Sequence, residues 1–343
     1  MTQPYLDVRD LRVQFSTEDG VVHAVDGVTF SVEQGRTLAI VGESGSGKSV
    51  TSLAIMGLAG KNADVSGEII IDGQDVLTST KNEVRAIRGK KVAMIFQDPL
   101  SSLHPFYRIG DQLVEAIKVH GRMGHKEARK RSIQMLDRVG IPNAGRRIDD
   151  YPHQLSGGMR QRVVIAMGLI NDPQLIIADE PTTALDVTVQ AQIIELLKDL
   201  QAEFGTAIVI ITHDLGVVAN VADEVVVMYG GRIVEHSLIH DIFYQPQMPY
   251  TLGLLASIPR LDVEEGGRLD PIPGSPPSLI NLPKGCVFRP RCTYHEQVPG
   301  NRCDTERPEL LPTTLDHEVR CHLTPSQRRQ IATEAIAATG AKA

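Results

Sequence analysis

An α/β fold built around a parallel sheet is predicted by three features of this 343-residue sequence. Apolar runs with the length of buried strands recur along the chain, at residues 37–41, 91–96, 174–178, 206–212 and 224–229. Helical patterns lie between them, as in "TVQAQIIELLKDLQAEF", and a glycine-rich loop follows the first run. Buried strands that alternate with helices form parallel sheets covered on both faces.

The remaining elements are predicted from local patterns. Residues 5–40 are expected to form β-strands, because alternating or continuous apolar residues are interrupted there by glycines. Another strand is expected at 67–73. The apolar spacing after the glycine-rich loop predicts a helix, and residues 107–171 are predicted to be mostly helical. The charged stretch "HKEARKRSIQMLDRVG" within them is expected to be a solvated helix face.

The composition of the chain changes near residue 259, where proline and glycine become frequent and hydrophobic periodicity fades. Such a change is typical of a domain boundary. We therefore expect a larger domain over residues 1–258 and a small irregular extension over 259–330, which contains all four cysteines. Residues 331–343 are expected to be a frayed tail.

The net charge and the aromatic content exclude some classes of partner. The net charge is −7, tryptophan is absent and aromatic residues make up 4% of the chain. A nucleic-acid-binding protein usually carries a basic surface, and single strands usually stack on aromatic side chains. We therefore expect no nucleic-acid partner.

The hydrophobic segments suggest where the protein is located. No apolar run approaches eighteen residues, and the N-terminal sequence "MTQPYLDVRD" lacks the regions of a signal peptide. We therefore expect a cytosolic chain that does not span a bilayer by itself. Cysteines in that compartment are reduced thiols or metal ligands rather than disulfides.

The glycine-rich loop "GESGSGKSV" matches the phosphate-binding pattern G-x-x-x-x-G-K-[ST] between a strand and a helix. Backbone amides of such a loop and the positive end of the helix dipole bind phosphate oxygens. Lys48 would reach the β- and γ-phosphates, and the Ser49 hydroxyl would reach Mg²⁺. The alternative is a glycine turn without a ligand. The expected ATP-binding residues are Gly42, Ser44, Gly45, Ser46, Gly47, Lys48, Ser49 and Val50.

Two adjacent carboxylates follow the apolar run in "LIIADE". Asp179 stands where a carboxylate is needed for Mg²⁺, and Glu180 is the better candidate to orient or deprotonate the attacking water. The alternative is that both are solvated residues at the end of a strand.

A second glycine-rich segment, "LSGGMRQR" at residues 155–162, lies between these two motifs. Ser156 can cap a helix there, and Gly157 and Gly158 leave its first amides bare for a phosphate. One chain does not need two phosphate surfaces for one nucleotide. Two chains do, if each completes the site of the other. A helix cap without a ligand is the alternative.

These motifs together resemble the ATP-binding-cassette ATPases, and the resemblance covers residues 5 to about 258. It implies a RecA-like core with an antiparallel β subdomain and a helical subdomain, which hydrolyses ATP with Mg²⁺. In the signature segment Met159 stands where glutamine is common, and Gln161 follows two residues later. Ser156, Gly157, Gly158 and Gln161 would act on the partner's ATP.

The same resemblance assigns further residues. Gln97 matches the glutamine that contacts Mg²⁺ or water and senses the transmembrane partner, and His213 matches the histidine that contacts the γ-phosphate. Ala184, Leu185 and Asp186 match the D-loop. Phe15 matches the aromatic that stacks on adenine. The alternative is that Phe15 is a core residue. Tyr5 and His23 are the other candidates for stacking on adenine.

A narrower resemblance is to the ATPase subunits of dipeptide, oligopeptide and nickel importers. It rests on "QDPLSSLHP", in which His104 replaces an asparagine, on "PYTLGLLASIPRLD" and on "IPGSPPSLINLPKGCVFRPRC". It implies a helical subdomain at about 98–160 and a groove beside Gln97 for a permease helix.

The partners implied by this resemblance are a second, non-identical ATPase subunit, two permeases and an extracytoplasmic solute-binding protein. The chain would lie at the cytoplasmic face of the inner membrane. Peptide is the favoured solute, and nickel or another solute is the alternative. A soluble ABC ATPase that acts on nucleic acid or ribosomes, or an exporter ATPase, is the rival class.

The four cysteines, Cys286, Cys292, Cys303 and Cys321, are separated by five, ten and seventeen residues. The spacing lacks C-x-x-C and does not favour a zinc knuckle or a common ferredoxin pattern. Four thiols can nevertheless hold a small segment together. The resemblance implies a [4Fe–4S] cluster, with Zn²⁺ or plain thiols as alternatives. His295, His317 and His322 are expected at the surface rather than as ligands.

Overall fold

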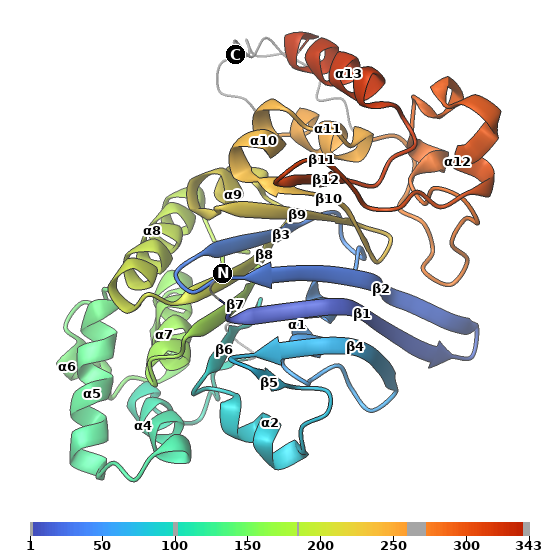
Figure 1. The fold of residues 1–343 in the computed structure, drawn as a ribbon. Helices are drawn as coiled ribbons and strands as arrows, with labels where there is room; N and C mark the ends of the chain where they lie inside the picture. Colours follow the sequence, from blue (N-terminus) through green and yellow to red (C-terminus); the bar gives the residue numbers. More distant parts are fainter. Residues whose placement is uncertain (1–2, 99–101, 184, 259–271, 339–343) are drawn as a thin grey trace.

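The computed structural model describes residues 3–98, 102–183, 185–258 and 272–338. It confirms the α/β fold, with a larger and a smaller sheet and helices around them (Figure 1). The boundary predicted at 259 falls at residues 259–271, which lie outside the described residues, as do Ala184 of the expected D-loop and residues 99–101 of the expected helical subdomain.

The larger sheet has the strand order β11-β12-β10-β9-β3-β8-β7-β6. Its central strands β9, β3, β8, β7 and β6 are parallel neighbours, as predicted, and β10 pairs antiparallel with β9. Every residue of β3, β7 and β8 is buried, because helices or the smaller sheet cover both faces. The strands are β3 (Thr37–Val41), β6 (Val92–Ile95), β7 (Leu175–Asp179), β8 (Ala207–Thr212), β9 (Glu224–Tyr229) and β10 (Arg232–Leu238).

The smaller sheet is antiparallel, with the order β2-β1-β4-β5. Its strands are β1 (Leu6–Thr17), β2 (Gly20–Val32), β4 (Ala63–Ile71) and β5 (Gln74–Asp75). Apolar side chains of β1 and β4 share one buried cluster with β3 and β8 and with α1 (Lys48–Ile55). Helix α1 therefore packs between the two sheets.

The helical region extends away from the sheets on the side of β6 (Figure 1). It contains α4 (Ile109–His120), α5 (His125–Arg138), α6 (Ala144–Arg147), η1 (Pro152–Gln154) and α7 (Gly157–Leu169). In α5 only Ala128, Ser132, Met135 and Leu136 are buried, so its charged residues form the solvated face that the sequence predicts. The other helices that the structure describes before residue 259 are α2 (Lys81–Ile87), α8 (Val187–Phe204), α9 (Leu215–Val221), α10 (Ile239–Tyr244) and α11 (Pro249–Ala256).

The C-terminal extension is less irregular than the sequence predicts, because its strand β12 pairs antiparallel with β10 and lengthens the larger sheet. Long-range pairing of this kind leaves no local pattern in a segment rich in proline. The elements are η2 (Arg289–Arg291), η3 (His295–Gln297), η4 (Pro299–Asn301), α12 (Arg302–Thr305), β11 (Leu311–Thr314), β12 (His317–Val319) and α13 (Pro325–Ala338).

A buried polar contact joins β12 to β10. The expectation that His317 lies at the surface is wrong, because the residue is 3% exposed and its Nε2 lies 2.8 Å from Oε1 of the fully buried Glu235. The same carboxylate accepts hydrogen bonds from the backbone amides of Gln247 and Met248. Buried polar groups are stable only when they are paired, so this contact fixes the extension to the sheet.

The expectation of a frayed tail from residue 331 is also wrong for the part that the structure describes. Helix α13 continues to Ala338, and Ile331 and Ala332 are buried. Ile331 packs in a small cluster with Val298, Cys303 and Leu323, which gives this helix an apolar anchor. Residues 339–343 lie outside the described residues.

We predict that His317→Ala lowers the free energy of unfolding by about 3 kcal/mol, because Glu235 loses a buried partner. His240→Ala is the matched control, since His240 pairs with Asp241 at the surface, and we expect a loss below about 0.5 kcal/mol. Denaturant unfolding of the full chain measures both. Equal losses would show that the buried pair does not hold the extension.

Candidate active site

The glycine-rich loop follows β3 and lies against backbone atoms of two other strands. The Gly42 φ is +150° and the Gly47 φ is +104°, conformations that favour glycine. A Cβ on Gly42 would lie 2.2 Å from the Met228 carbonyl oxygen, and one on Gly47 would lie 2.4 Å from the Ala24 carbonyl oxygen. Only glycine therefore fits at these two positions.

Lys48 is buried, and its Nζ donates hydrogen bonds to the carbonyl oxygens of Gly42, at 2.7 Å, and Glu43, at 2.9 Å. The side chain therefore lies across the loop. Burial lowers the pKa of Lys48, and the nearby charges of Glu180, Asp179 and Glu43 oppose that shift. An anionic phosphate placed there would further favour the charged ammonium.

The first turn of α1 has no side-chain cap, because its N-cap residue is Gly47. The first amides of a helix have no acceptor within the helix and bind anions readily. The Ser46 hydroxyl is buried in the same loop and has no hydrogen-bond partner among the described residues. These donors suit a phosphate group, as the sequence predicts.

Of the three residues expected to hold Mg²⁺, Ser49 and Asp179 are in contact, and Gln97 contacts the neighbouring Glu180. Ser49 Oγ donates to Asp179 Oδ1 at 3.1 Å, at the end of the buried strand β7. Burial raises the pKa of Asp179, with Ser49 and Lys48 opposing the shift. Hydroxyl and carboxylate oxygens are the hard ligands that Mg²⁺ prefers, and a cation would stabilise the buried carboxylate. The donor set therefore fits magnesium.

The three residues predicted to be catalytic also meet at one carboxylate. Gln97 Nε2 donates to Glu180 Oε2 at 2.8 Å, and His213 Nδ1 lies 3.3 Å from Glu180 Oε1. Thr183, which the sequence analysis missed, donates its hydroxyl to Oε2 at 2.8 Å. The sequence spacing could have indicated this contact, since Thr183 follows Glu180 by three residues in the segment after the strand.

Glu180 is held in an unusual state. Its φ is +46°, in the left-handed region that non-glycine residues seldom adopt. Burial alone would raise the pKa of Glu180, but the hydrogen bonds from Thr183 and His213 outweigh it, so the pKa lies below its usual value. The carboxylate is therefore ionised at neutral pH.

The signature helix α7 begins as predicted. Ser156 is the N-cap residue, its Oγ accepts the Met159 amide at 3.3 Å, and Ser156 and Gly157 are exposed. Among the described residues no hydrogen bond joins Ser156 to the loop at 42–49 of the same chain. A Cβ on Gly158 would lie 2.8 Å from Val189 Cγ1, so this glycine also permits close packing against α8. Asp186 caps α8 by accepting the Val189 amide at 3.0 Å.

The assignment of Gln161 to the partner's nucleotide is wrong. Gln161 is 1% exposed, and its Nε2 donates to the Pro181 carbonyl oxygen at 2.7 Å. Gln161 lies one helical turn after Gly158, on a face of α7 that packs against the rest of the fold. Gln161 therefore connects α7 to the segment after Glu180 and does not reach solvent.

The three aromatic candidates for the adenine differ in their surroundings. Tyr5 is 8% exposed, and its hydroxyl lies 3.5 Å from the Lys91 carbonyl oxygen, so Tyr5 is a core residue. Phe15 and His23 are half-buried on the paired strands β1 and β2. Phe15 packs against the core cluster and keeps part of its ring accessible.

The four cysteine thiols influence one another electrostatically and are free. Burial raises the pKa of Cys286 and of Cys321 to about 12 and that of Cys292 to about 11, and the pKa of Cys303 is also raised. Within the described residues no group of three or more His, Cys, Asp or Glu side chains forms a metal site. His295 and His322 are half-buried and contact the backbone carbonyls of Cys292 and Glu306, respectively.

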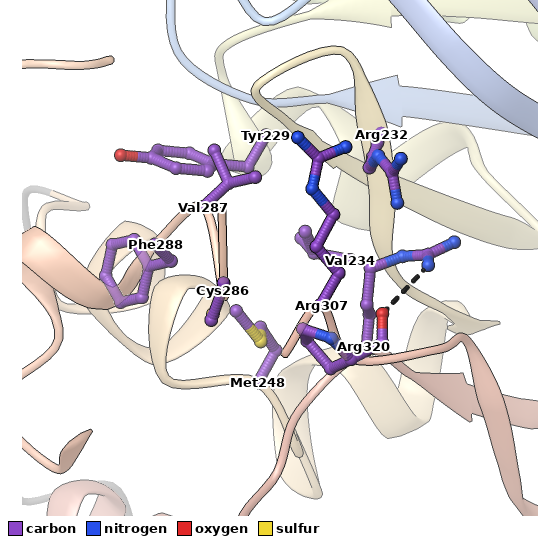
Figure 2. A pocket seen from close by; sticks show the side chains of 11 residues that line it. Tyr229, Arg232, Val234, Met248, Cys286, Val287, Phe288, Arg307 and Arg320 are labelled. Atoms are coloured by element: carbon purple, nitrogen blue, oxygen red, sulfur yellow. Dashed lines mark hydrogen bonds between the residues drawn. The ribbon is translucent and has the colours of Figure 1, made fainter. Parts of the chain in front are cut away.

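A small cavity of about 20 Å³ adjoins Cys286, between the hairpin of β9 and β10 and the extension. Figure 2 shows Tyr229, Val287 and Phe288 around it, with the Arg320 guanidinium turned away and bonded to the Pro308 carbonyl. The space suits a water molecule at most.

None of the described helices has the length and apolar character to cross a membrane.

The loop, the paired carboxylates and the exposed signature helix on this fold define a P-loop ATPase of the ATP-binding-cassette class. The family model for the ABC transporter matches residues 25–183, and the model for the oligopeptide/dipeptide transporter C-terminal region matches residues 234–298. The chain therefore belongs to the ABC transporter family, in the group of ATP-hydrolysing subunits that carry this C-terminal region.

Similar proteins agree with this placement. The oligopeptide transport ATP-binding protein OppD of Salmonella typhimurium is 52% identical over 86% of this chain and 88% of its own length. The dipeptide transport ATP-binding protein DppD of Bacillus subtilis is 50% identical over 93% of this chain and 94% of its own. Among solved structures, the dimeric post-hydrolysis cassette MJ0796 bound to ADP and Pi has a TM-score of 0.62 and 29% identity, and covers 68% of this chain and 98% of its own.

We predict that Gln161→Met lowers the free energy of unfolding by about 1–2 kcal/mol, because the buried Pro181 carbonyl loses its donor. ATP hydrolysis should fall as well, since Pro181 directly follows Glu180. Gln192→Met is the matched control, because Gln192 is exposed and its Oε1 accepts a hydrogen bond from Arg162 at the surface. If the two variants behaved alike in denaturant unfolding and ATPase assays, Gln161 would have no positioning role.

Proposed function

We propose that this protein is the ATPase subunit of an importer that takes up peptides through partner membrane permeases. The observation that carries the catalytic part is the Glu180 carboxylate, held by Gln97, Thr183 and His213 beside Lys48. The names of the similar oligopeptide and dipeptide transport proteins support peptides as the solute. Nickel or another solute is the alternative.

The proposed reaction uses the groups already described. The triphosphate would bind the amides of the loop at 42–49 and the Lys48 ammonium, with adenine against Phe15. Ser49, Asp179 and Gln97 would hold Mg²⁺, which neutralises phosphate charge. Glu180 would take a proton from a water molecule while the water oxygen attacks the γ-phosphorus. The bond between the γ-phosphorus and the bridging oxygen would break, and ADP would leave with that oxygen. His213 would contact the γ-phosphate.

The site would be completed by a second ATPase subunit, in a heterodimer. The exposed Ser156 and the bare amides of Gly157 and Gly158 suit a phosphate, and no hydrogen bond among the described residues joins Ser156 to the loop of its own chain. Asp186 lies at the start of α8 and accepts the Val189 amide. Val189 in turn packs against Gly158, so Asp186 lies near the exposed start of α7. Binding of ATP would thus stabilise the closed pair and drive the permeases between two states.

A groove beside Gln97 supports the permease partner. It has a volume of about 670 Å³ and lies between β6, α4 and α7. Leu58, Phe96 and Val119 are exposed apolar residues in its lining. Exposed apolar surface of this kind suits the apolar face of a short helix. A permease docked here would hold the chain at the cytoplasmic face of the inner membrane, within a complex that includes a solute-binding protein.

The rival class, a soluble ABC ATPase acting on nucleic acid or ribosomes, is disfavoured by the net charge of −7. The match of the C-terminal region to the oligopeptide/dipeptide transporter model also favours transport.

We also propose that the four cysteines hold a metal centre, a [4Fe–4S] cluster or Zn²⁺. Backbone amides donate hydrogen bonds to three of the four sulfurs, and such bonds would stabilise thiolates. The donors are Phe288 and Arg289 for Cys286, Tyr294 and His295 for Cys292, and Leu323 for Cys321. The raised pKa values keep the metal-free thiols neutral, and coordination would release their protons. The four sulfurs would have to converge further on the metal.

We predict that Glu180→Gln lowers ATP hydrolysis at least about 100-fold, because the amide cannot accept a proton, and leaves ATP binding intact. Cells whose only copy carries this change should lose uptake of labelled dipeptide and keep that of labelled nickel. Glu195→Gln, on the exposed face of α8, is the control. Loss of nickel uptake alone would identify a nickel importer, and loss of neither would contradict both transport proposals.

Anaerobic purification tests the metal centre. We expect stoichiometric iron with sulfide, or zinc, in the wild-type protein, and a clear loss of bound metal together with a lower unfolding temperature in Cys292→Ser. Protein that contains neither metal under these conditions would contradict the proposal.

A further inference from the structure

We propose that Arg291, in the cysteine-bearing extension, is a positioning residue of the phosphate-binding loop and acts by holding Glu43. Arg291 and Glu43 are 248 residues apart in sequence. The guanidinium donates from its two terminal nitrogens to the two carboxylate oxygens of Glu43, at 3.0 Å for the Nη2 contact. Two parallel hydrogen bonds of this kind fix orientation as well as distance.

The environment of the ion pair makes it strong. The Arg291 side chain is 4% exposed and that of Glu43 is 27% exposed. The remaining donors of Arg291 are also used, because Nε donates to the Pro273 carbonyl at 2.8 Å and Nη2 to the Ile272 carbonyl at 3.3 Å. An exposed ion pair contributes little, whereas a desolvated, fully hydrogen-bonded pair resists separation.

Glu43 is the second residue of the loop, and all its polar groups are engaged. Its amide donates to the Tyr250 hydroxyl at 2.8 Å, and its carbonyl oxygen accepts from Lys48 Nζ at 2.9 Å. The Ser46 amide donates to the same carbonyl oxygen at 3.2 Å. Any rotation of the Glu43 peptide would therefore move an acceptor of the lysine that meets the phosphates.

Three aromatic rings pack together beside the ion pair of Arg291 and Glu43. Tyr229 ends β9, Tyr250 lies on α11, and Phe288 belongs to the extension. Their centroids are 4.6 Å (Tyr229–Tyr250), 5.2 Å (Tyr229–Phe288) and 5.4 Å (Tyr250–Phe288) apart. Figure 2 shows Tyr229 beside Val287 and Phe288. The Arg291 guanidinium carbon lies 5.9 Å from the centroid of the Tyr229 ring.

The consequence is a physical link from the extension to the ATP site. Arg291 immediately precedes Cys292, and Cys286 lies five residues before it, so the fold of the cysteine segment sets the position of the guanidinium. Since the loop contains several glycines, its backbone has little stiffness of its own. The extension supplies that stiffness. This inference rests on the proposed binding of phosphates by residues 42–49.

The test is titration of the full chain with Mg-ATP, which reports both the Kd and the number of sites. Arg291→Met should raise the Kd about tenfold at unchanged stoichiometry, the range expected for a lost charge-assisted hydrogen bond. Arg291→Lys, which keeps the charge but cannot bind both oxygens, should raise it about threefold. The double variant Glu43→Gln/Arg291→Met should bind no worse than Arg291→Met alone, because both changes remove one contact.

Arg289→Met is the matched control. Arg289 lies in the same short helix, η2, and pairs with Asp304 inside the extension, so its loss perturbs the extension without touching the loop. Its Kd should stay within about twofold of wild type. An Arg291→Met Kd equal to that of Arg289→Met would overturn the inference, as would a lower stoichiometry at unchanged Kd, which indicates only partial unfolding. If Lys48→Ala also bound ATP normally, the assignment of the loop itself would fall.

Discussion

Close contact between backbone atoms around the phosphate-binding loop is the constraint on which the rest of the structure depends. At Gly42 and Gly47 even one extra carbon would overlap the carbonyl oxygens of Met228 and Ala24. The loop can therefore form only where β9 of the larger sheet and β2 of the smaller sheet meet at a fixed distance. The arrangement of the two sheets and the helix α1 between them is thus a condition for binding phosphate.

Two adjacent carboxylates at the end of β7 have opposite properties, and this separates their roles. The pKa of Asp179 is raised because burial is not fully offset, so this residue gains from a cation. The pKa of Glu180 is lowered because hydrogen bonds from Thr183 and His213 outweigh burial. Asp179 is therefore suited to hold a metal, whereas Glu180 is kept ionised and oriented by its hydrogen bonds, although both follow the same strand.

The C-terminal extension is an integral part of the ATPase fold. It adds β12 to the larger sheet, buries His317 against Glu235, and brings Arg291 to the second residue of the phosphate-binding loop. The last two contacts join polar side chains that are buried or half-buried, so each side chain depends on its partner. This explains why a segment rich in proline and with few apolar residues can adopt a defined structure, and why its state can influence the nucleotide site.

The sequence by itself determined the features that depend on neighbours along the chain. The order of strands and helices, the loop at 42–49, the carboxylates Asp179 and Glu180, and the capping of α7 by Ser156 all follow from local patterns. Gln97 and His213 were assigned to the ATP site through the family resemblance, and the structure brings both side chains to the Glu180 carboxylate.

Only the tertiary structure decided which side chains face inward and which distant residues meet. Gln161 follows Gly158 closely in sequence, yet the direction of α7 in the fold buries it against Pro181. His317 and Arg291 appear in an irregular segment without periodicity, and their partners lie 82 and 248 residues away. Local spacing carries no information about such pairs, because they are brought together by sheet pairing and core packing rather than by chain geometry.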